Sequence, residues 1–121
     1  MRSLSGASLA CVAMLALGSL TAGCAKVGEI KAKKAFKSAN QAYQAQDYRK
    51  AGEFYEETIA ADPNLNAAYF FLGNSYDNQY KPSKKGEAAN DAFLTKAVDN
   101  YQKAAEKLAA SRLGSAATAS S

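Results

Sequence analysis

The chain of 121 residues has no histidine and no tryptophan, and it contains only two cysteines. Without histidine it lacks a general base with an ordinary pKa near neutrality, and histidine-ligated metal sites are excluded. Two cysteines are too few for a zinc site built from cysteine alone. We therefore expect a protein that is not an enzyme, with no catalytic residues, no metal and no cofactor.

The charge balance is mild, with 15 basic and 11 acidic side chains and a net charge of +4. Such a charge does not by itself favour nucleic-acid binding. At 48% hydrophobic and 21% charged residues, the composition is that of a folded protein. The length suits one small domain, so we expect a single folded domain that does not bind nucleic acid.

An uncharged run follows Arg2 and extends to Ala25, with its apolar centre at residues 9–17. A charge, then an apolar stretch, then small residues is the order typical of a secretory signal. The strongly apolar part is about 9–12 residues long, against roughly 20 for a membrane-spanning helix. We therefore expect export. An ordinary cleaved signal and an uncleaved signal anchor are the alternatives.

The run closes with Leu20-Thr21-Ala22-Gly23-Cys24. Small residues before a cysteine resemble the lipobox of bacterial lipoproteins. The resemblance implies a signal peptide at residues 1–23, acylation of Cys24 and a lipidated linker at 24–30. It places the mature protein in the bacterial cell envelope, on the periplasmic side of a membrane to which its lipid anchors it. In enteric bacteria an aspartate directly after the acylated cysteine resembles an inner-membrane retention signal. This position is Ala25 here, so the resemblance favours the outer membrane.

The remaining sequence predicts an all-α fold. Apolar residues recur at helical spacing over residues 31–46, 48–61, 66–79 and 91–110. Asp47 is a good N-cap for the second of these helices, and Pro63 marks the turn after it. Asp91 is expected to cap the fourth helix and Gly114 to end it, with a loop at 80–90 and a disordered tail at 113–121.

Two helix pairs of similar size suggest an internal repeat. The second pair carries Tyr69, Leu72-Gly73 and Tyr76, and the first carries Ala51 and Tyr55. This pattern resembles the tetratricopeptide repeat (TPR) family. The resemblance implies a TPR-like domain at 31–112, a fragment of an α-solenoid with two antiparallel helix pairs. The units are about 31–64 and 65–110, and the loop at 80–90 is an insertion in the second. The repeat core would be Ala39, Ala51, Tyr55, Pro63, Tyr69, Leu72, Gly73, Tyr76, Ala97 and Tyr101. An unrelated four-helix bundle is the alternative.

In this family the first helix of each unit lines a concave face that binds peptides. The equivalent residues here form a candidate peptide groove: Phe36, Asn40, Tyr43, Phe70, Asn74 and Asp77. The resemblance thus implies a protein-protein interaction or scaffold module with a protein partner of unknown identity. The alternatives are a self-assembling structural envelope protein and an accessory subunit of an envelope enzyme or assembly complex.

Two groups of lysines are further candidates for contact with anionic lipid head groups. Lys31, Lys33, Lys34 and Lys37 follow the expected anchor, and Lys81, Lys84 and Lys85 lie in the expected loop. Solvated surface is the simpler interpretation of both.

Overall fold

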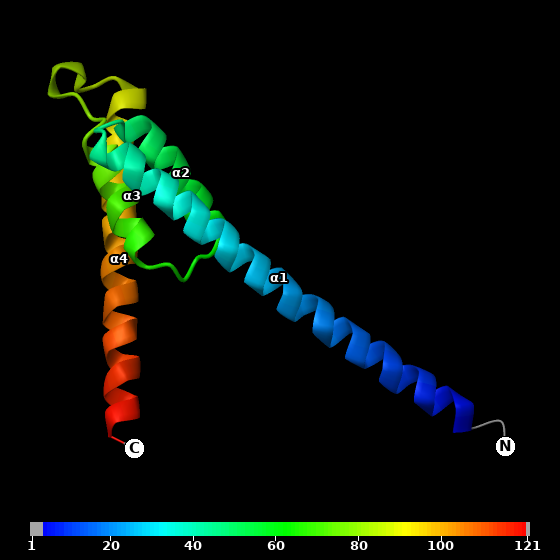
Figure 1. The fold of residues 1–121 in the computed structure, drawn as a ribbon. Helices are drawn as coiled ribbons and strands as arrows, with labels where there is room; N and C mark the ends of the chain where they lie inside the picture. Colours follow the sequence, from blue (N-terminus) through cyan, green and yellow to red (C-terminus); the bar gives the residue numbers. More distant parts are fainter. Residues whose placement is uncertain (1–3, 121) are drawn as a thin grey trace.

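The computed structural model describes residues 4–120, and side chains from residue 23 onward. This part of the chain is helical, which confirms the all-α prediction (Figure 1). The elements are α1 (Leu4–Gln44), α2 (Tyr48–Ala61), α3 (Ala67–Asp77), a short 3₁₀ turn η1 (Pro82–Lys84) and α4 (Ala88–Ala119).

Successive helices pack against one another: α1 against α2, α2 against α3, and α3 against α4. They run in alternating directions, so that α1 and α3 point the same way (Figure 1). The N-terminal part of α1 and the C-terminal part of α4 project from this packed region and diverge from each other (Figure 1). The core therefore lies among the C-terminal part of α1, the helices α2 and α3, and the part of α4 that packs on α3.

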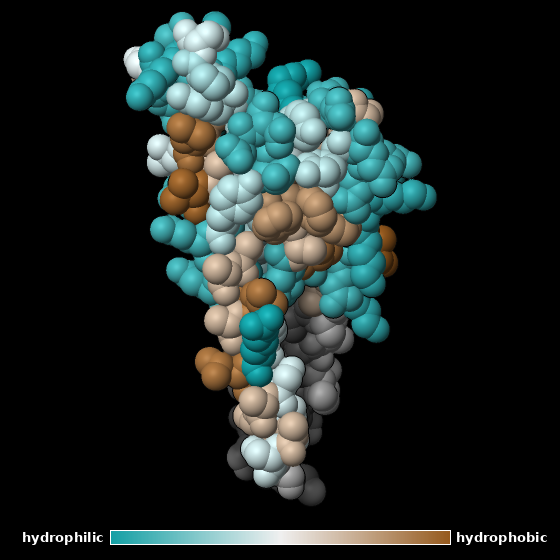
Figure 2. Space-filling view, turned by 90° about the vertical axis from the view of Figure 1, so that its left-hand side faces the viewer, coloured by the Kyte–Doolittle hydropathy of each residue, from teal (hydrophilic) through white to brown (hydrophobic). Residues whose placement is uncertain are grey.

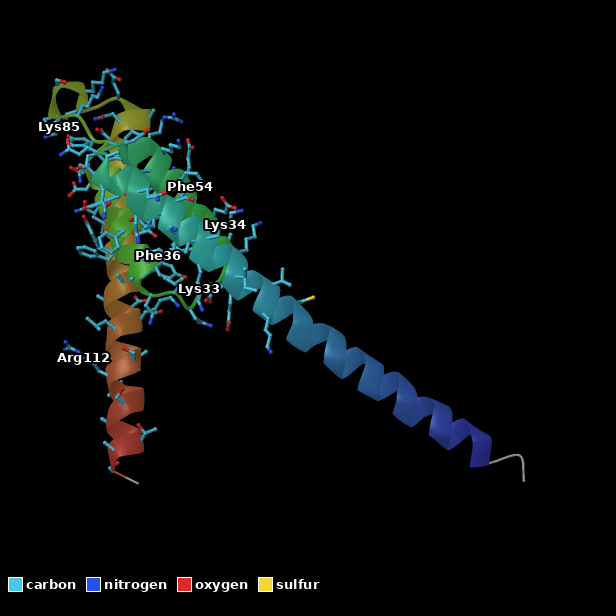
Figure 3. All side chains as sticks on the ribbon, viewed as in Figure 1. Lys33, Lys34, Phe36, Phe54, Lys85 and Arg112 are labelled. Atoms are coloured by element: carbon cyan, nitrogen blue, oxygen red, sulfur yellow. The ribbon has the colours of Figure 1, made fainter. Side chains whose placement is uncertain are left out.

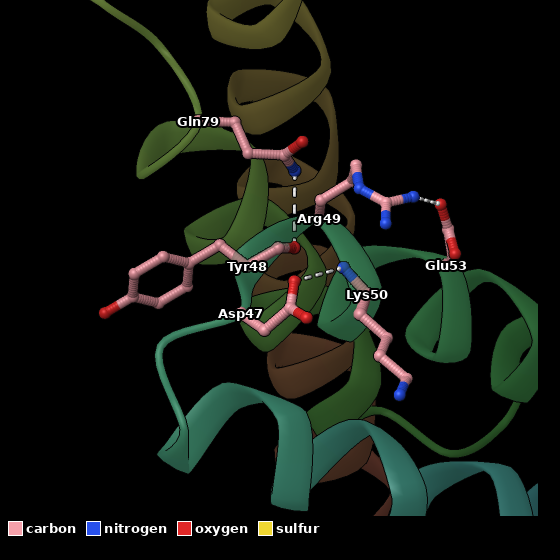
Figure 4. Close-up of polar contacts among 6 residues, drawn as sticks. All are labelled: Asp47, Tyr48, Arg49, Lys50, Glu53 and Gln79. Carbon is pink, nitrogen blue, oxygen red and sulfur yellow. Dashed lines mark hydrogen bonds and ion pairs between the residues drawn. The ribbon is translucent and has the colours of Figure 1, made fainter.

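The helix α2 begins and ends where the sequence predicts. Asp47 caps its first turn, because the carboxylate Oδ1 accepts a hydrogen bond from the Lys50 backbone N–H at 3.1 Å (Figure 4). The Gln79 side chain, which follows α3, donates to the Tyr48 carbonyl oxygen at 3.3 Å and so ties the start of α2 to the end of α3. Arg49 and Glu53 form an exposed ion pair of 2.7 Å along the helix.

The outer ends of α1 and α4 differ from the expectation. Residues 24–30, expected as a linker, are helical within α1, and α4 continues through Gly114 to Ala119 instead of ending in a disordered tail. A glycine inside a helix costs about 1 kcal/mol relative to alanine. The alanines around Gly114 favour the helix, and one glycine does not end it.

The segment between α3 and α4 is ordered by a residue that the sequence analysis did not single out. The buried Asn90 side chain accepts a hydrogen bond from the Lys81 N–H at 2.8 Å and donates to the Lys81 carbonyl at 3.0 Å. Asp91 accepts from the Gly86 N–H at 2.9 Å, whereas the residue at the N-cap position of α4 is Glu87. Asp91 thus fastens the segment between α3 and α4 and does not cap the helix.

The core combines small residues with tyrosines. Ala39, Ala51 and Tyr55 are fully buried. A Cβ added to Gly73 would lie 3.0 Å from Tyr101 Cδ1, so a glycine is needed where α3 approaches α4. The expected core residues that are buried are Ala39, Ala51, Tyr55, Tyr69, Leu72, Gly73, Tyr76 and Ala97, whereas Tyr101 is half-buried.

Pro63 is the expected core residue that lies exposed. It belongs to the turn between α2 and α3, where a residue without a backbone N–H cannot continue the helix. Its carbonyl oxygen accepts a hydrogen bond from the Tyr69 hydroxyl at 2.9 Å. Pro63 therefore contributes through its backbone and not through side-chain burial.

Candidate functional site

The first helix pair is joined by a tyrosine of α2, Tyr55, that contacts several residues of α1. The Tyr55 hydroxyl donates a hydrogen bond to Asn40 Oδ1 at 2.7 Å. The Tyr55 ring packs against Phe36, with ring centroids 5.9 Å apart and the planes tilted by 59°.

The second helix pair brings the same residue types together. Asn74 Nδ2 lies 3.4 Å from the Tyr101 hydroxyl, and the rings of Phe70 and Tyr101 are 5.7 Å apart and tilted by 50°. Phe70 and Asn74 each lie 34 residues after their counterparts in α1, and Tyr101 lies 46 residues after Tyr55. The same three residue types thus lie together in both pairs, but the hydrogen bond is reversed: Tyr55 donates to Asn40, whereas Asn74 donates to Tyr101.

Tyr43 connects the two pairs. Its hydroxyl donates to Asn74 Oδ1 at 2.6 Å, and its ring meets Tyr48 and Phe71 edge to face at 5.6 and 5.4 Å. Because the hydroxyl and the ring edges are already engaged, Tyr43 holds α1 against α3 and does not offer a free binding group.

The predicted peptide groove is therefore brought together but largely filled by its own side chains. Four members are half-buried and contact other core residues: Phe36, Asn40, Tyr43 and Asn74. Phe70, which is 50% exposed, and Asp77 remain accessible. The accessible part of the predicted groove thus lies on α3, on its side toward α4.

The electrostatics of this network favour neutral tyrosines. Burial, and to a lesser extent nearby Tyr43, raises the pKa of Tyr55 to about 12. Burial also raises the pKa of Tyr101; the hydrogen bond from Asn74 opposes this shift, whereas the Asp77 carboxylate adds to it. Neither hydroxyl is suited to proton transfer near neutral pH.

A groove of about 550 Å³ opens between the start of α3 and the middle of α4. We call it the α3·α4 groove; Phe70, Tyr101, Ala104, Ala105 and Leu108 line it. Phe70 and Leu108 are 50% and 53% exposed, and Figure 2 shows hydrophobic residues gathered on this face of the molecule. Leu108 falls within the expected helix at 91–110, but apolar periodicity alone does not tell which of its apolar residues have a partner.

The lysines of α1 lie on its outer surface. Lys31, Lys33, Lys34 and Lys37 are exposed, and Figure 3 labels Lys33 and Lys34 on this helix. Within residues 23–120 the ion pairs are Arg49 with Glu53, and Lys84 with Glu87 at 3.7 Å. The α1 lysines therefore carry charge that no carboxylate of the described residues pairs with.

Cys24, the expected lipidation site, is exposed on α1 and forms no disulfide. The expected signal peptide at residues 1–23 lies outside the described side chains, apart from Gly23. Among the helices searched in the described region, none has the length and apolar content needed to cross a membrane. The same region contains no cluster of carboxylates and cysteines able to hold a metal ion.

Comparison with known proteins gave no relative: no family model matches the chain, and neither does a curated protein or a solved structure.

Proposed function

We propose that this chain is a lipid-anchored TPR protein of the bacterial cell envelope, which binds a protein partner and acts as a scaffold without catalysis of its own. The observation that carries the proposal is that a tyrosine, an asparagine and a phenylalanine are grouped in the same way in the two helix pairs. The equivalent residues of α1 and α3 lie 34 positions apart, which equals the length of a TPR unit.

The second offset supports the same interpretation. Ala97 and Tyr101 lie 46 residues after Ala51 and Tyr55, which is 12 more than the first offset. The segment between α3 and α4, fastened by Asn90, accounts for the difference. The second unit is thus a TPR-like pair with an insertion between its helices.

The anchoring part of the proposal depends on Cys24. It is exposed, it follows two small residues, and it precedes the basic stretch of α1. In the proposal the acylated cysteine holds the domain at the periplasmic side of the outer membrane, where the helix pairs meet a protein partner.

A fatty-acid labelling experiment tests the anchor. Cells that express the full chain are supplied with a fatty-acid analogue, and the Cys24→Ser variant is compared with the parent. We expect the parent to be labelled and the variant to lose the label. Equal labelling of both proteins would overturn the lipoprotein part of the proposal.

Site-specific photocrosslinking in cells tests the binding part. A photoreactive aromatic residue replaces Phe70, at the accessible part of the predicted groove, or Lys85, in the insertion. Leu113, which is 73% exposed on the projecting part of α4, is the control position. A discrete adduct from the Phe70 position alone is the expected result. Adducts only from the Lys85 position would assign binding to the insertion, and none from either would contradict the proposal.

Self-assembly is the second candidate function, because a monomer that leaves Phe70 and Leu108 about half exposed in one groove has an unpartnered apolar surface. Sedimentation velocity of the full chain over a range of concentrations decides between the two functions.

A further inference from the structure

We propose that the α3·α4 groove binds an amphipathic helix of a partner protein, packed there as α3 packs on the first helix pair, with an aromatic side chain against Tyr101. This inference rests on the proposed binding function and adds the chemistry of the partner.

The first helix pair shows what such a groove accepts. Tyr55 contacts Phe36 of its own pair, and Phe71 of α3 stacks on it with ring centroids 5.8 Å apart and planes 16° from parallel. With both contacts made, Tyr55 is fully buried. The helix α3 is thus a partner helix that the chain itself supplies to α1 and α2.

The second pair has the contact between tyrosine and phenylalanine within the pair, but it lacks a ring from a further helix like that of Phe71 on Tyr55. Tyr101 contacts Phe70, the counterpart of Phe36, and both rings line the α3·α4 groove. Tyr101 remains half-buried, and Ala105 is exposed where its counterpart Ile59 is packed on the core. The groove is therefore the place where a further helix would complete the arrangement seen around Tyr55.

A second copy of this chain stacked head to tail does not suit the groove. Phe71 and Leu72 of α3 face the first pair: Phe71 stacks on Tyr55, and Leu72 approaches Gly52. The residues of α1 that lie 34 positions earlier are Lys37 and Ser38. An α1 helix that entered the groove would bury a lysine where α3 presents an aromatic ring, at a cost in desolvation.

The charges at the two ends of the groove indicate the direction and polarity of the partner helix. Arg112 lies one turn beyond Leu108 and projects from the side of α4 that Figure 2 turns toward the viewer (Figure 3). Asp77, the last residue of α3, lies close enough to Tyr101 to raise its pKa. Neither charge has an ion-pair partner among the described residues.

A helix placed as α3 is placed would run parallel to α3, as α3 runs parallel to α1 (Figure 1). Its first turn would then lie near Arg112 and its last turn near Asp77. An acidic residue in the first turn and a basic one in the last would pair with these two charges and also favour the helix dipole. On α4 the groove extends from Tyr101 to Ser111, roughly 15 Å at 1.5 Å per residue, which suits a helix of about three turns.

The probe for this proposal is a peptide with the sequence of residues 65–79, since α3 already fits the equivalent site. It carries Asn66→Glu and Asp77→Lys to match the end charges, a lactam bridge that keeps it helical, and a fluorescent label. Fluorescence anisotropy measures its binding to the full chain. We expect Phe71→Ala in the peptide to weaken binding about tenfold or more, because aromatic anchors dominate such contacts.

Variants of the full chain locate the site. Leu108→Asp places a carboxylate in the groove, and we expect it to weaken peptide binding about tenfold or more. Leu113→Asp makes the same change at an exposed leucine outside the groove and should leave affinity within about twofold. Arg112→Glu should weaken binding of this peptide. It should improve binding of a second peptide that carries Asn66→Lys instead of Asn66→Glu. Because all three positions are exposed, the helical circular dichroism of each variant should match the parent.

Several results would overturn the proposal. It fails if Phe71→Ala in the peptide has no effect, if Leu108→Asp binds like the parent, or if Leu113→Asp weakens binding equally. It also fails if sedimentation velocity finds a dimer that Leu108→Asp dissociates, because a second copy then fills the groove. If the peptide does not bind but crosslinks from the Phe70 position persist in cells, the partner is not a helix in this groove, and the proposed scaffold function still stands.

Discussion

At the scale of single residues, the close approach of α3 and α4 depends on the missing side chain of Gly73. A Cβ there would meet the Tyr101 ring at 3.0 Å and the Ala97 carbonyl at 3.1 Å. Gly73→Leu should therefore lower the free energy of unfolding by about 1–3 kcal/mol through overpacking. Urea denaturation followed by circular dichroism measures the change.

Gly114 provides the matched control, because nothing lies within 4 Å of the Cβ position and the residue is inside α4. Gly114→Ala should increase helicity and not destabilise the domain, since alanine is favoured over glycine by about 1 kcal/mol within a helix. If Gly73→Leu unfolds at the same urea concentration as the parent, the helix contact described here is wrong.

The buried Tyr55 predicts a loss of stability in alkali. Its pKa is raised from 10.0 to about 12 in the folded protein, so the folded state holds its proton more tightly than the unfolded state. The stabilisation is complete below pH 10 and is lost as the pH rises toward 12. Over this interval the free energy of unfolding should fall by up to about 1.4 kcal/mol per pH unit.

Denaturation midpoints measured across this pH range test the prediction, with Tyr55→Phe as the control for other groups that titrate in alkali. The variant loses the hydrogen bond to Asn40 and should start less stable, but its stability should decline less between pH 10 and 12. Parallel curves for the parent and the variant would show that Tyr55 does not control the alkaline transition.

At the scale of the elements, local chemistry decided what the sequence could predict. The bounds of α2 were predictable because an Asp N-cap and a Pro turn act within a few residues of its ends. The outer ends of α1 and α4 were not, because no tertiary contact marks where a regular helix leaves the core. The groove residues were assigned to the correct helices, but whether Tyr43 would be free depended on Asn74, 31 residues away.

The conformation of the segment between α3 and α4 should depend on Asn90 more than on the lysines of that segment. Asn90→Ala removes two hydrogen bonds to the Lys81 backbone from a buried site. We expect it to lower the free energy of unfolding by about 1–3 kcal/mol, because buried backbone groups lose their partners. Amide hydrogen exchange should also become faster at Lys81, whose N–H donates to the Asn90 side chain.

Lys85→Ala is the control within the same segment, since this side chain is exposed and forms no ion pair among the described residues. Its stability should stay within about 0.5 kcal/mol of the parent. Unchanged exchange in Asn90→Ala would mean that the segment is held by contacts other than this pair of hydrogen bonds.

At the scale of the whole molecule, the basic charge of α1 lies close to the proposed anchor and away from the segment between α3 and α4. The exposed lysines 33, 34 and 37 lie opposite a buried face that contains Ala32, Ala35 and Ala39. Lys85 lies at the other end of the packed region (Figure 3). A membrane reached through Cys24 would therefore meet the α1 lysines first.

This arrangement predicts salt-sensitive binding to anionic membranes. Vesicles that contain phosphatidylglycerol should bind the unacylated Cys24→Ser chain more tightly than phosphatidylcholine vesicles, and binding should weaken as salt is added. Lys33→Glu, Lys34→Glu and Lys37→Glu together should reduce the partition coefficient at least tenfold, since each lysine near such a surface contributes about 1 kcal/mol. The same reversal at Lys81, Lys84 and Lys85 is the control and should have a smaller effect, because Lys84 is already paired with Glu87 at 3.7 Å whereas the α1 lysines have no such partner among the described residues. Vesicle co-sedimentation measures the partition coefficient of both triple variants. Equal decreases in the two would show that net charge alone, and not the position of the α1 lysines, governs contact with the membrane.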